Sequence, residues 1–175
     1  MKRFLIFLLL SAPLLMAAYR SEHRELPRQQ FPAHIVSASG DTVDVGKLAK
    51  NKRIVVITLK ATWCPVCQRQ LVRIKQQLEQ IEYCPITFLV LSPGPAKDLR
   101  AIKKRIGFPY PFIEDKNLTI AKKFDLVLNQ ERGEITPAIF ILRSDLSVGW
   151  IQLGRNGSYY GDPALFDEID CGNWL

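Results

Sequence analysis

The chain has 175 residues, which suits one domain of ordinary size together with a short N-terminal targeting segment. Hydrophobic residues make up 47% and charged residues 23%, a globular composition that excludes bulk disorder. The formal net charge is +7, but the basic residues are scattered and show no stripe with interleaved aromatic side chains, so we expect no nucleic-acid partner.

The first 18 residues have the order of an export signal. Lys2 and Arg3 precede an apolar stretch that runs, almost unbroken, to Ala18. This stretch is short for a membrane span, which needs about 20 apolar residues. We therefore expect either a cleaved signal peptide or a retained N-terminal membrane anchor. In both cases the domain would lie outside the cytoplasm, in a bacterial periplasm or an equivalent space.

The export segment is followed by a polar stretch and then by the patterns of a folded domain. Residues 19–31 are polar and charged, and we interpret them as a linker to a single domain over 32–175. Weak alternation around a Ser-Gly-Asp turn predicts a small hairpin over 34–45. The run 54–59 is apolar and rich in β-branched residues, which predicts a strand buried on both faces.

A helix is predicted from Cys64 onward. Pro65 suits the first turn, and apolar side chains then recur every three or four residues on one face, at Cys67, Leu71, Ile74, Leu78 and Ile81. A second buried strand is predicted over 86–91, and a second helix over 99–106 that ends at Gly107. This alternation predicts parallel strands joined by crossover helices.

The rest of the chain contains shorter signals. We expect an extended piece over 109–115 and a helix over 118–124. The runs 138–142 and 148–153 flank a turn and predict an antiparallel hairpin. A last helix is predicted over about 163–169, with Asp162 as its N-cap.

Cys64 and Cys67 stand at C-x-x-C spacing at the predicted start of the first long helix. Unpaired N–H groups and the dipole at a helix N-terminus favour an anion, so we expect a lowered pKa for the Cys64 thiol. Cys67 lies one turn inside, on the buried face, and should hold its proton more firmly. The pattern predicts that Cys64 attacks a partner disulfide and that Cys67 then resolves the mixed disulfide.

Other uses of the cysteines fit less well. A zinc site would need a second close pair, whereas Cys84 and Cys171 lie far apart in the sequence. Covalent haem attachment needs His directly after the pair, where Gln68 stands. A purely structural bridge within the pair would stabilise little, because the closed loop is short. We therefore expect no metal and no cofactor.

The chain resembles the redoxin branch of the thioredoxin superfamily and, more narrowly, exported reductases of the TlpA type. The matching segments span most of 32–170: Ala-Thr-Trp-Cys-Pro-Val-Cys at 61–67, Phe-Pro-Tyr-Pro-Phe at 108–112 with the acids at 114–115, residues 121–124, and Thr-Pro-Ala-Ile-Phe-Ile at 136–141. The resemblance implies a thioredoxin-like α/β fold, with a central mixed sheet and helices on both faces behind the N-terminal extension.

The resemblance also implies a substrate groove beside the cysteine pair. Pro137 would follow a cis peptide bond, which presents the backbone of Thr136 to an extended partner segment. Trp63 and Pro65 would flank the same groove. The alternative for Trp63 is a partly buried packing residue.

This chain departs from the family where relatives carry a buried acid that moves protons for the inner cysteine. Thr58 stands where thioredoxins often have Asp, and Gln70 stands where TlpA-like proteins often have Glu. Glu134 is the nearest acid in sequence to the expected site, so we take it as a candidate proton carrier, against an ordinary solvated loop residue. Lys60 either lowers the pKa of the Cys64 thiol or extends from a strand end to the surface.

Cys84 and Cys171 form a second candidate pair. Each follows a helix that, in the thioredoxin topology, covers the same face of the sheet and runs away from the active-site end. We therefore predict a structural Cys84–Cys171 disulfide, against two partly buried thiols.

The resemblance implies a thiol–disulfide oxidoreductase that acts as a reductant, as in cytochrome c maturation. Its partners would be protein thiols and disulfides and an upstream thiol reductant, membrane-bound or not; the oligomeric state stays open. A peroxiredoxin-type peroxidase remains an alternative, although the arginine that such enzymes carry near the late strand appears here only afterwards, at Arg143. A redox-inert domain that binds partners through the Pro137 groove is the third.

Overall fold

The computed structural model describes residues 27–154 and 162–169. The predicted export segment, most of the linker and Cys171 lie outside these ranges. Within the described ranges no helix is both long and apolar enough to cross a bilayer.

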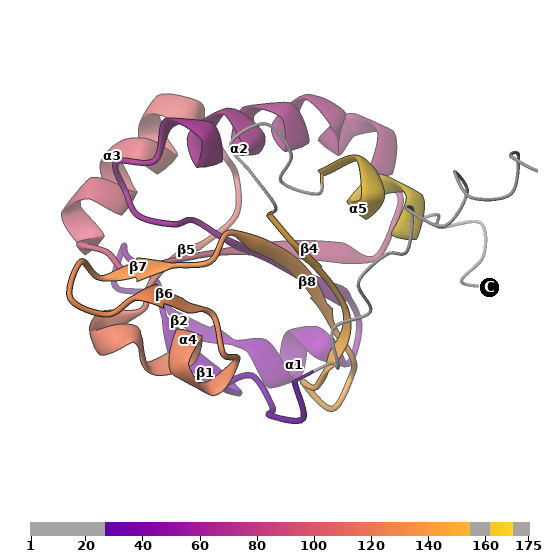
Figure 1. Cartoon of the computed structure of the whole chain (residues 1–175). Helices are drawn as coiled ribbons and strands as arrows, with labels where there is room; N and C mark the ends of the chain where they lie inside the picture. The colour runs from indigo at the N-terminus through magenta and orange to yellow at the C-terminus, as the bar shows by residue number, and fades with distance from the viewer. Residues whose placement is uncertain (1–26, 155–161, 170–175) are drawn as a thin grey trace, which may run out of the picture.

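A five-stranded mixed sheet forms the centre of the fold, in the order β5-β4-β3-β8-β9 (Figure 1). The first three of these strands run parallel, and β8 and β9 are antiparallel to their neighbours. The strands are β3 Arg53–Thr58, β4 Ile86–Ser92, β5 Phe112–Glu114, β8 Ala138–Leu142 and β9 Val148–Leu153.

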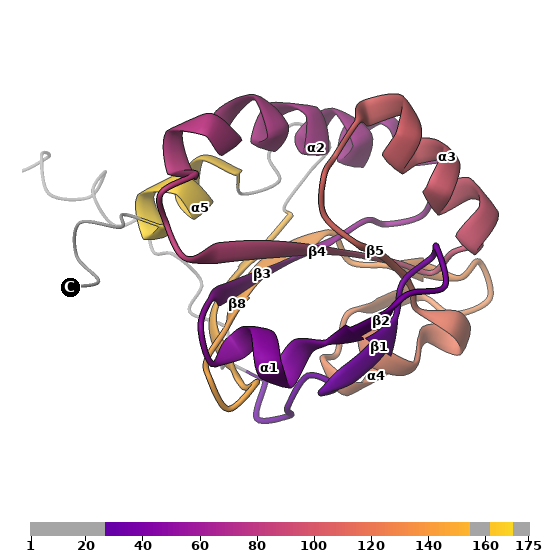
Figure 2. The same cartoon turned by 180° about the vertical axis from the view of Figure 1, so that it is seen from behind.

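Helices cover both faces of this sheet, as predicted (Figures 1 and 2). One face carries α2 Pro65–Gln77, α3 Ala96–Ile106 and α5 Asp162–Glu168. The other carries α1 Val45–Ala49 and α4 Thr119–Lys123. Short 3-10 turns follow α2 and precede α4, at η2 Leu78–Ile81 and η3 Lys116–Leu118.

Each face has its own apolar core, and β3 contributes to both. Val55 and Ile57 pack under α2, whereas Ile54 and Val56 pack on the side of α1 and α4. Because successive side chains of a strand point to opposite faces, a strand covered on both sides must be apolar throughout. This explains the continuous hydrophobic run that predicted β3.

Two small hairpins complete the described fold. The predicted hairpin over 34–45 is present as β1 His34–Val36 and β2 Thr42–Asp44. A second pair, β6 Val127–Asn129 and β7 Glu134–Ile135, was not predicted, nor was α1. These elements are two to five residues long, too short for a periodic pattern to emerge.

Candidate active site

The cysteine pair lies at the start of α2, where the loop after β3 ends. Cys64 is the N-cap of this helix and Pro65 is its first residue, which confirms the predicted helix start. Cys64 and Cys67 form a disulfide with their Cα atoms 5.4 Å apart. The Cys67 N–H donates to Cys64 Sγ over 3.3 Å, so the first sulfur occupies the place of a capping side chain.

Both sulfurs are buried, and each receives a backbone donor. Cys64 is 4% exposed and Cys67 is fully buried. The N–H of Lys60 points at Cys67 Sγ over 3.4 Å. Backbone donors stabilise a negative sulfur, and the donor at Cys64 is one of the unpaired N–H groups at the helix N-terminus. The assigned roles of attacking and resolving thiol stay predictions.

Glu134 is part of this site and is not a solvated loop residue. It lies in β7, is 6% exposed, and forms an ion pair with Lys60 Nζ at 3.1 Å. The N–H of Ile135 donates to the Lys60 carbonyl over 3.1 Å, which holds β7 against the loop that leads to Cys64. Lys60 therefore links the two groups: its side chain pairs with the buried carboxylate, and its backbone N–H contacts the inner cysteine.

Trp63 faces solvent beside the cysteine pair. Its side chain is 61% exposed, so the reading as a packing residue is wrong. The Lys60 ammonium lies 5.2 Å from the centroid of the indole ring, within the range of a cation–π contact. Lys60 thus extends from the strand end across an exposed ring to a buried acid.

The expectation of a cis peptide bond before Pro137 is wrong. Among the described residues the cis peptide bond is Gly94–Pro95, and the bond before Pro137 is trans. The backbone on both sides of Pro137 is already engaged, because the Thr58 hydroxyl donates to the Thr136 carbonyl over 2.8 Å and accepts the Ala138 N–H over 2.6 Å.

The Thr136 backbone is consequently not presented to a partner in the way the resemblance implied. Its N–H donates to the Leu126 carbonyl over 2.6 Å, and its own carbonyl is taken by Thr58. Pro137 itself is buried. Of the predicted groove residues, Trp63 and Pro65 remain on the surface beside the disulfide.

Gln68 is a site residue that sequence reasoning missed. Its Nε2 donates to the Thr62 carbonyl over 2.6 Å, and its Oε1 accepts from Arg105 Nη2 over 2.6 Å. It thereby ties the loop before Cys64 to helix α3. Gln70, the other glutamine of this turn, is buried inside the fold. The sequence signal that could have identified Gln68 is a polar residue directly after the C-x-x-C pair at the start of a helix.

Cys84 is buried in the same core cluster as Ile169. Ile169 directly follows α5 and is the last residue that the structure describes. Its predicted partner, Cys171, lies outside the described residues, so the second disulfide stays a prediction.

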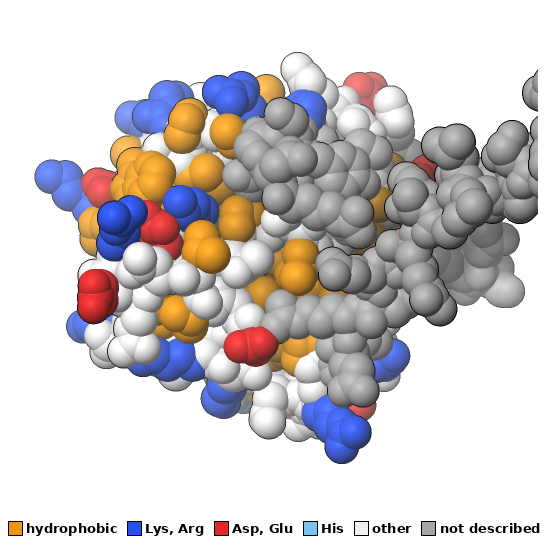
Figure 3. Space-filling view, viewed as in Figure 1, with side chains coloured by type: hydrophobic (Ala, Val, Ile, Leu, Met, Phe, Trp, Pro, Cys, Tyr) orange, Lys and Arg blue, Asp and Glu red, His pale blue; other side chains and the backbone are white. Residues whose placement is uncertain are grey.

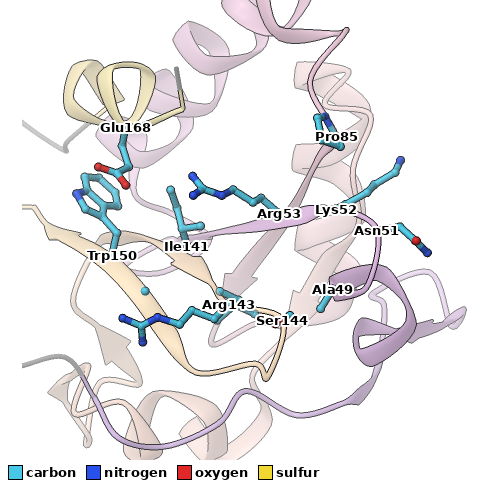
Figure 4. A pocket seen from close by; sticks show the side chains of 12 residues that line it. Ala49, Asn51, Lys52, Arg53, Pro85, Ile141, Arg143, Ser144, Trp150 and Glu168 are labelled. Carbon is cyan, nitrogen blue, oxygen red and sulfur yellow. The ribbon is translucent and has the colours of Figure 1, made fainter. Parts of the chain in front are cut away.

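A hollow of about 510 Å³ lies at the opposite end of the sheet (Figure 4). Its lining includes Arg53 at the start of β3, Arg143 and Trp150. Because β3 runs from Arg53 at this end to Thr58 near the cysteines, the hollow is separate from the disulfide. Arg143 Nη1 donates to the Val148 carbonyl over 2.7 Å, within the β8–β9 turn.

The surface charges agree with the scattered sequence pattern. On the face shown in Figure 3, the Lys and Arg side chains are distributed around the rim and lie among acidic and hydrophobic ones. Residues 27–154 and 162–169 contain no cluster of His, Cys, Asp and Glu that could hold a metal ion.

Several solved structures share this fold. Peroxidoxin BcpB from Mycobacterium tuberculosis has a TM-score of 0.68 at 15% identity and covers 82% of this chain and 96% of its own. Peroxiredoxin Q from Xanthomonas campestris has a TM-score of 0.68 at 18% identity, with 82% and 93% covered. A secreted Mycobacterium tuberculosis disulfide oxidoreductase homologous to DsbE of E. coli has a TM-score of 0.59 at 16% identity, with 77% and 91% covered.

These identities are low, so the likenesses establish the thioredoxin-like fold and not an activity. No curated protein matches the sequence. The model of one family, AhpC/TSA, matches residues 25–151. The chain therefore belongs to the AhpC/TSA family, a redoxin family of the thioredoxin superfamily.

Proposed function

We propose that the protein is a thiol–disulfide oxidoreductase that reduces disulfides of partner proteins through Cys64 and Cys67. The observation that carries the proposal is the disulfide at the mouth of α2, where Cys64 Sγ takes a helix N–H donor and Cys67 is fully buried. A sulfur stabilised as an anion at the helix N-terminus and a second sulfur one turn inside are the two parts that stepwise exchange requires.

The reaction begins with the reduced pair. The Cys64 thiolate attacks one sulfur of the partner disulfide; a Cys64–partner bond forms, the partner's S–S bond breaks, and the released partner thiolate takes up a proton. Cys67 then loses its proton and attacks Cys64 Sγ, which forms the Cys64–Cys67 disulfide and releases the second partner sulfur. Two electrons pass to the partner, and an upstream thiol reductant restores the pair.

Glu134 is the proposed proton carrier for Cys67. It is the acid that the chain brings to the site, and it shares the contact residue Lys60 with the inner cysteine. A carboxylate held in a buried position can take the proton that Cys67 must lose before it attacks.

A second candidate is a peroxidase, favoured by the likeness to peroxidoxin BcpB and peroxiredoxin Q. In that reaction a cysteine thiolate cleaves the peroxide O–O bond, becomes a sulfenic acid and releases water or an alcohol; a second cysteine then forms the disulfide and releases water. Arg143 cannot assist here, because it follows the end of β8 opposite to the one that pairs with Thr58.

One set of measurements separates these two candidates from each other and from a redox-inert binding domain. Reduced protein is mixed with insulin or with hydrogen peroxide, and the fast kinetics and products are followed. Disulfide exchange predicts rapid reduction of insulin, loss of that activity in Cys64→Ser, and a trapped mixed disulfide through Cys64 in Cys67→Ser. A peroxide reaction far faster than that of free cysteine, with slow insulin reduction, would support the peroxidase instead. Full retention of in vivo function in Cys64→Ser would support a redox-inert binding domain.

The proposals for location and redox direction are based on the N-terminal sequence and on the resemblance to reductases of the TlpA type. We propose export through residues 1–18, as a cleaved signal or an anchor, with 19–31 as linker and 32–175 as a periplasmic domain. The reducing direction is tested by the potential of the pair in a dithiothreitol buffer. A potential below about −200 mV fits a reductant in that compartment, and one near about −120 mV reverses the direction.

A further inference from the structure

The surface beside the cysteine pair carries two exposed guanidinium groups. Arg69 lies on α2, and Arg105 lies in the last turn of α3. Both side chains are exposed, and in the described part of the chain neither has a carboxylate within ion-pair distance. We propose that Arg69 and Arg105 bind an acidic segment of the partner protein next to its disulfide. This role rests on the function proposed above and names the class of partner.

Helix geometry brings Arg69 to the site. Cys64 caps α2 and Pro65 is its first residue, so Arg69 follows Pro65 by about one turn on the same face. Pro65 and Arg69 are both exposed, and residues at this spacing have Cβ atoms about 5–6 Å apart. The long side chain of Arg69 can therefore reach the surface around Cys64.

Arg105 is held at the site by Gln68, the residue after Cys67. Its Nη2 donates to Gln68 Oε1 over 2.6 Å, and Gln68 Nε2 donates to the Thr62 carbonyl in the loop before Cys64, also over 2.6 Å. Nε and Nη1 of Arg105 have no partner among the described residues. A guanidinium that is already positioned and still has free N–H groups is suited to bind a carboxylate.

The two helices next to the pair are strongly basic. Their charged residues, apart from Asp98, are Arg69, Arg73 and Lys75 on α2 and Lys97, Arg100, Lys103, Lys104 and Arg105 on α3. In Figure 3, Lys and Arg side chains lie along the upper edge, where α2 and α3 run in Figure 1. The positive potential of such a surface attracts acidic partners and speeds their encounter.

Other cations near the two arginines already have partners. Lys60 is paired with Glu134. Lys75 Nζ donates to the Ile106 carbonyl over 2.8 Å, at the end of α3. Because the two arginines lie beside the attacking sulfur, a partner that presents its disulfide to Cys64 brings the neighbouring residues onto them. A protein segment with Asp or Glu beside the disulfide fits this position better than a membrane surface does.

The test compares matched disulfide peptides as substrates of the reduced protein. Each peptide has one internal disulfide, flanked on both sides by Asp, by Asn or by Lys, and its rate of reduction is measured at low and high salt. The Asp peptide should be reduced about 5- to 20-fold faster than the Asn peptide at low salt, because charge attraction raises the association rate. This ratio should fall to about twofold or less at about 1 M salt, where charges are screened.

Variants locate the preference. Arg69→Gln/Arg105→Gln should reduce the Asp and Asn peptides at nearly equal rates, and Arg69→Glu/Arg105→Glu should favour the Lys peptide. The ratio between two peptides cancels any change in folding or in the reactivity of Cys64. Lys104→Gln is the matched control and should keep the wild-type ratio. Lys104 is exposed in the same turn of α3, on the side of Arg100, which donates to a carbonyl of the β1–β2 loop and not to α2.

The same rates separate this inference from the proposed function. A wild-type protein that reduces none of the peptides overturns the proposed function and this inference with it. Equal reduction of the Asp and Asn peptides at low salt overturns recognition by the two arginines alone. So does a preference that falls as far in Lys104→Gln as in the double Gln variant. Binding to vesicles of anionic phospholipid that requires both arginines, without a preference for the Asp peptide, would assign this surface to a membrane instead.

Discussion

Two buried carboxylates of this protein have opposite kinds of partner. Asp115, 2% exposed, accepts the backbone N–H groups of Ile120 and Ala121, each over 2.8 Å. Glu134, 6% exposed, is paired with the side chain of Lys60. Backbone donors cannot leave without unwinding α4, whereas a lysine side chain can move. The first acid therefore holds the start of α4 in place, and the second, whose partner can move, is the one we propose for proton transfer.

The largest effect on stability is expected at Asp115. Asp115→Ala leaves two buried helix donors without an acceptor and should lower the free energy of unfolding by about 3 kcal/mol. Urea denaturation measures this, and Glu131→Ala in the exposed β6–β7 turn is the matched control. An Asp115→Ala protein as stable as the control would contradict the claim that Asp115 stabilises the fold.

A variant of Thr58 tests whether a buried polar side chain that binds the backbone stabilises the fold and takes no part in disulfide exchange. Thr58→Val keeps the shape but removes the hydroxyl that binds the Thr136 carbonyl and the Ala138 N–H, with an expected loss of about 2 kcal/mol. The rate of disulfide exchange per folded molecule should change little. A large change in that rate without loss of stability would mean that Thr58 belongs to the proton path.

Glu134 should show the reverse behaviour. Glu134→Gln leaves Lys60 able to reach water, so the free energy of unfolding should fall by only about 1 kcal/mol. Resolution of the mixed disulfide should slow on the order of tenfold or more at neutral pH. Equal losses of stability in Glu134→Gln and Asp115→Ala, with exchange unaffected, would show that both acids are structural.

The smallest effect is expected at Tyr110, a partly buried phenol that packs against the core under α2 and α3. Burial raises the pKa of Tyr110 above 10.0. The folded protein then keeps a phenol proton that the unfolded chain loses, so this contribution to stability is present below pH 10 and is lost as the pH rises through the folded pKa. Comparison of unfolding midpoints at alkaline pH for the wild type and Tyr110→Phe measures it; parallel curves would contradict the assignment.

The sequence was sufficient for the sheet, the long helices and the cysteine pair, since each has a strong local signal. The continuous apolar runs of β3 and β4, the glycine that ends α3 and the proline that opens α2 all lie where predicted. The N-cap position of Cys64 follows from the same local rules.

The rest of the site depends on contacts between distant segments. Glu134 pairs with Lys60 only because the short β6–β7 hairpin returns to the strand end, and two- and three-residue strands leave no periodic signal. The expectation of a cis bond before Pro137 was wrong because it came from the resemblance alone, whereas most X–Pro bonds are trans. The bridge between Cys84 and Cys171 stays a prediction.

The central claim is that Cys64 is the attacking thiol. Reduced protein is alkylated with iodoacetamide over a range of pH, and mass mapping assigns the rate to each cysteine. The account predicts one fast-reacting thiol, Cys64, that ionises well below the value of free cysteine, about 8.5, while Cys67 reacts slowly. Equal reaction of both thiols, each ionising near the value of free cysteine, would contradict it.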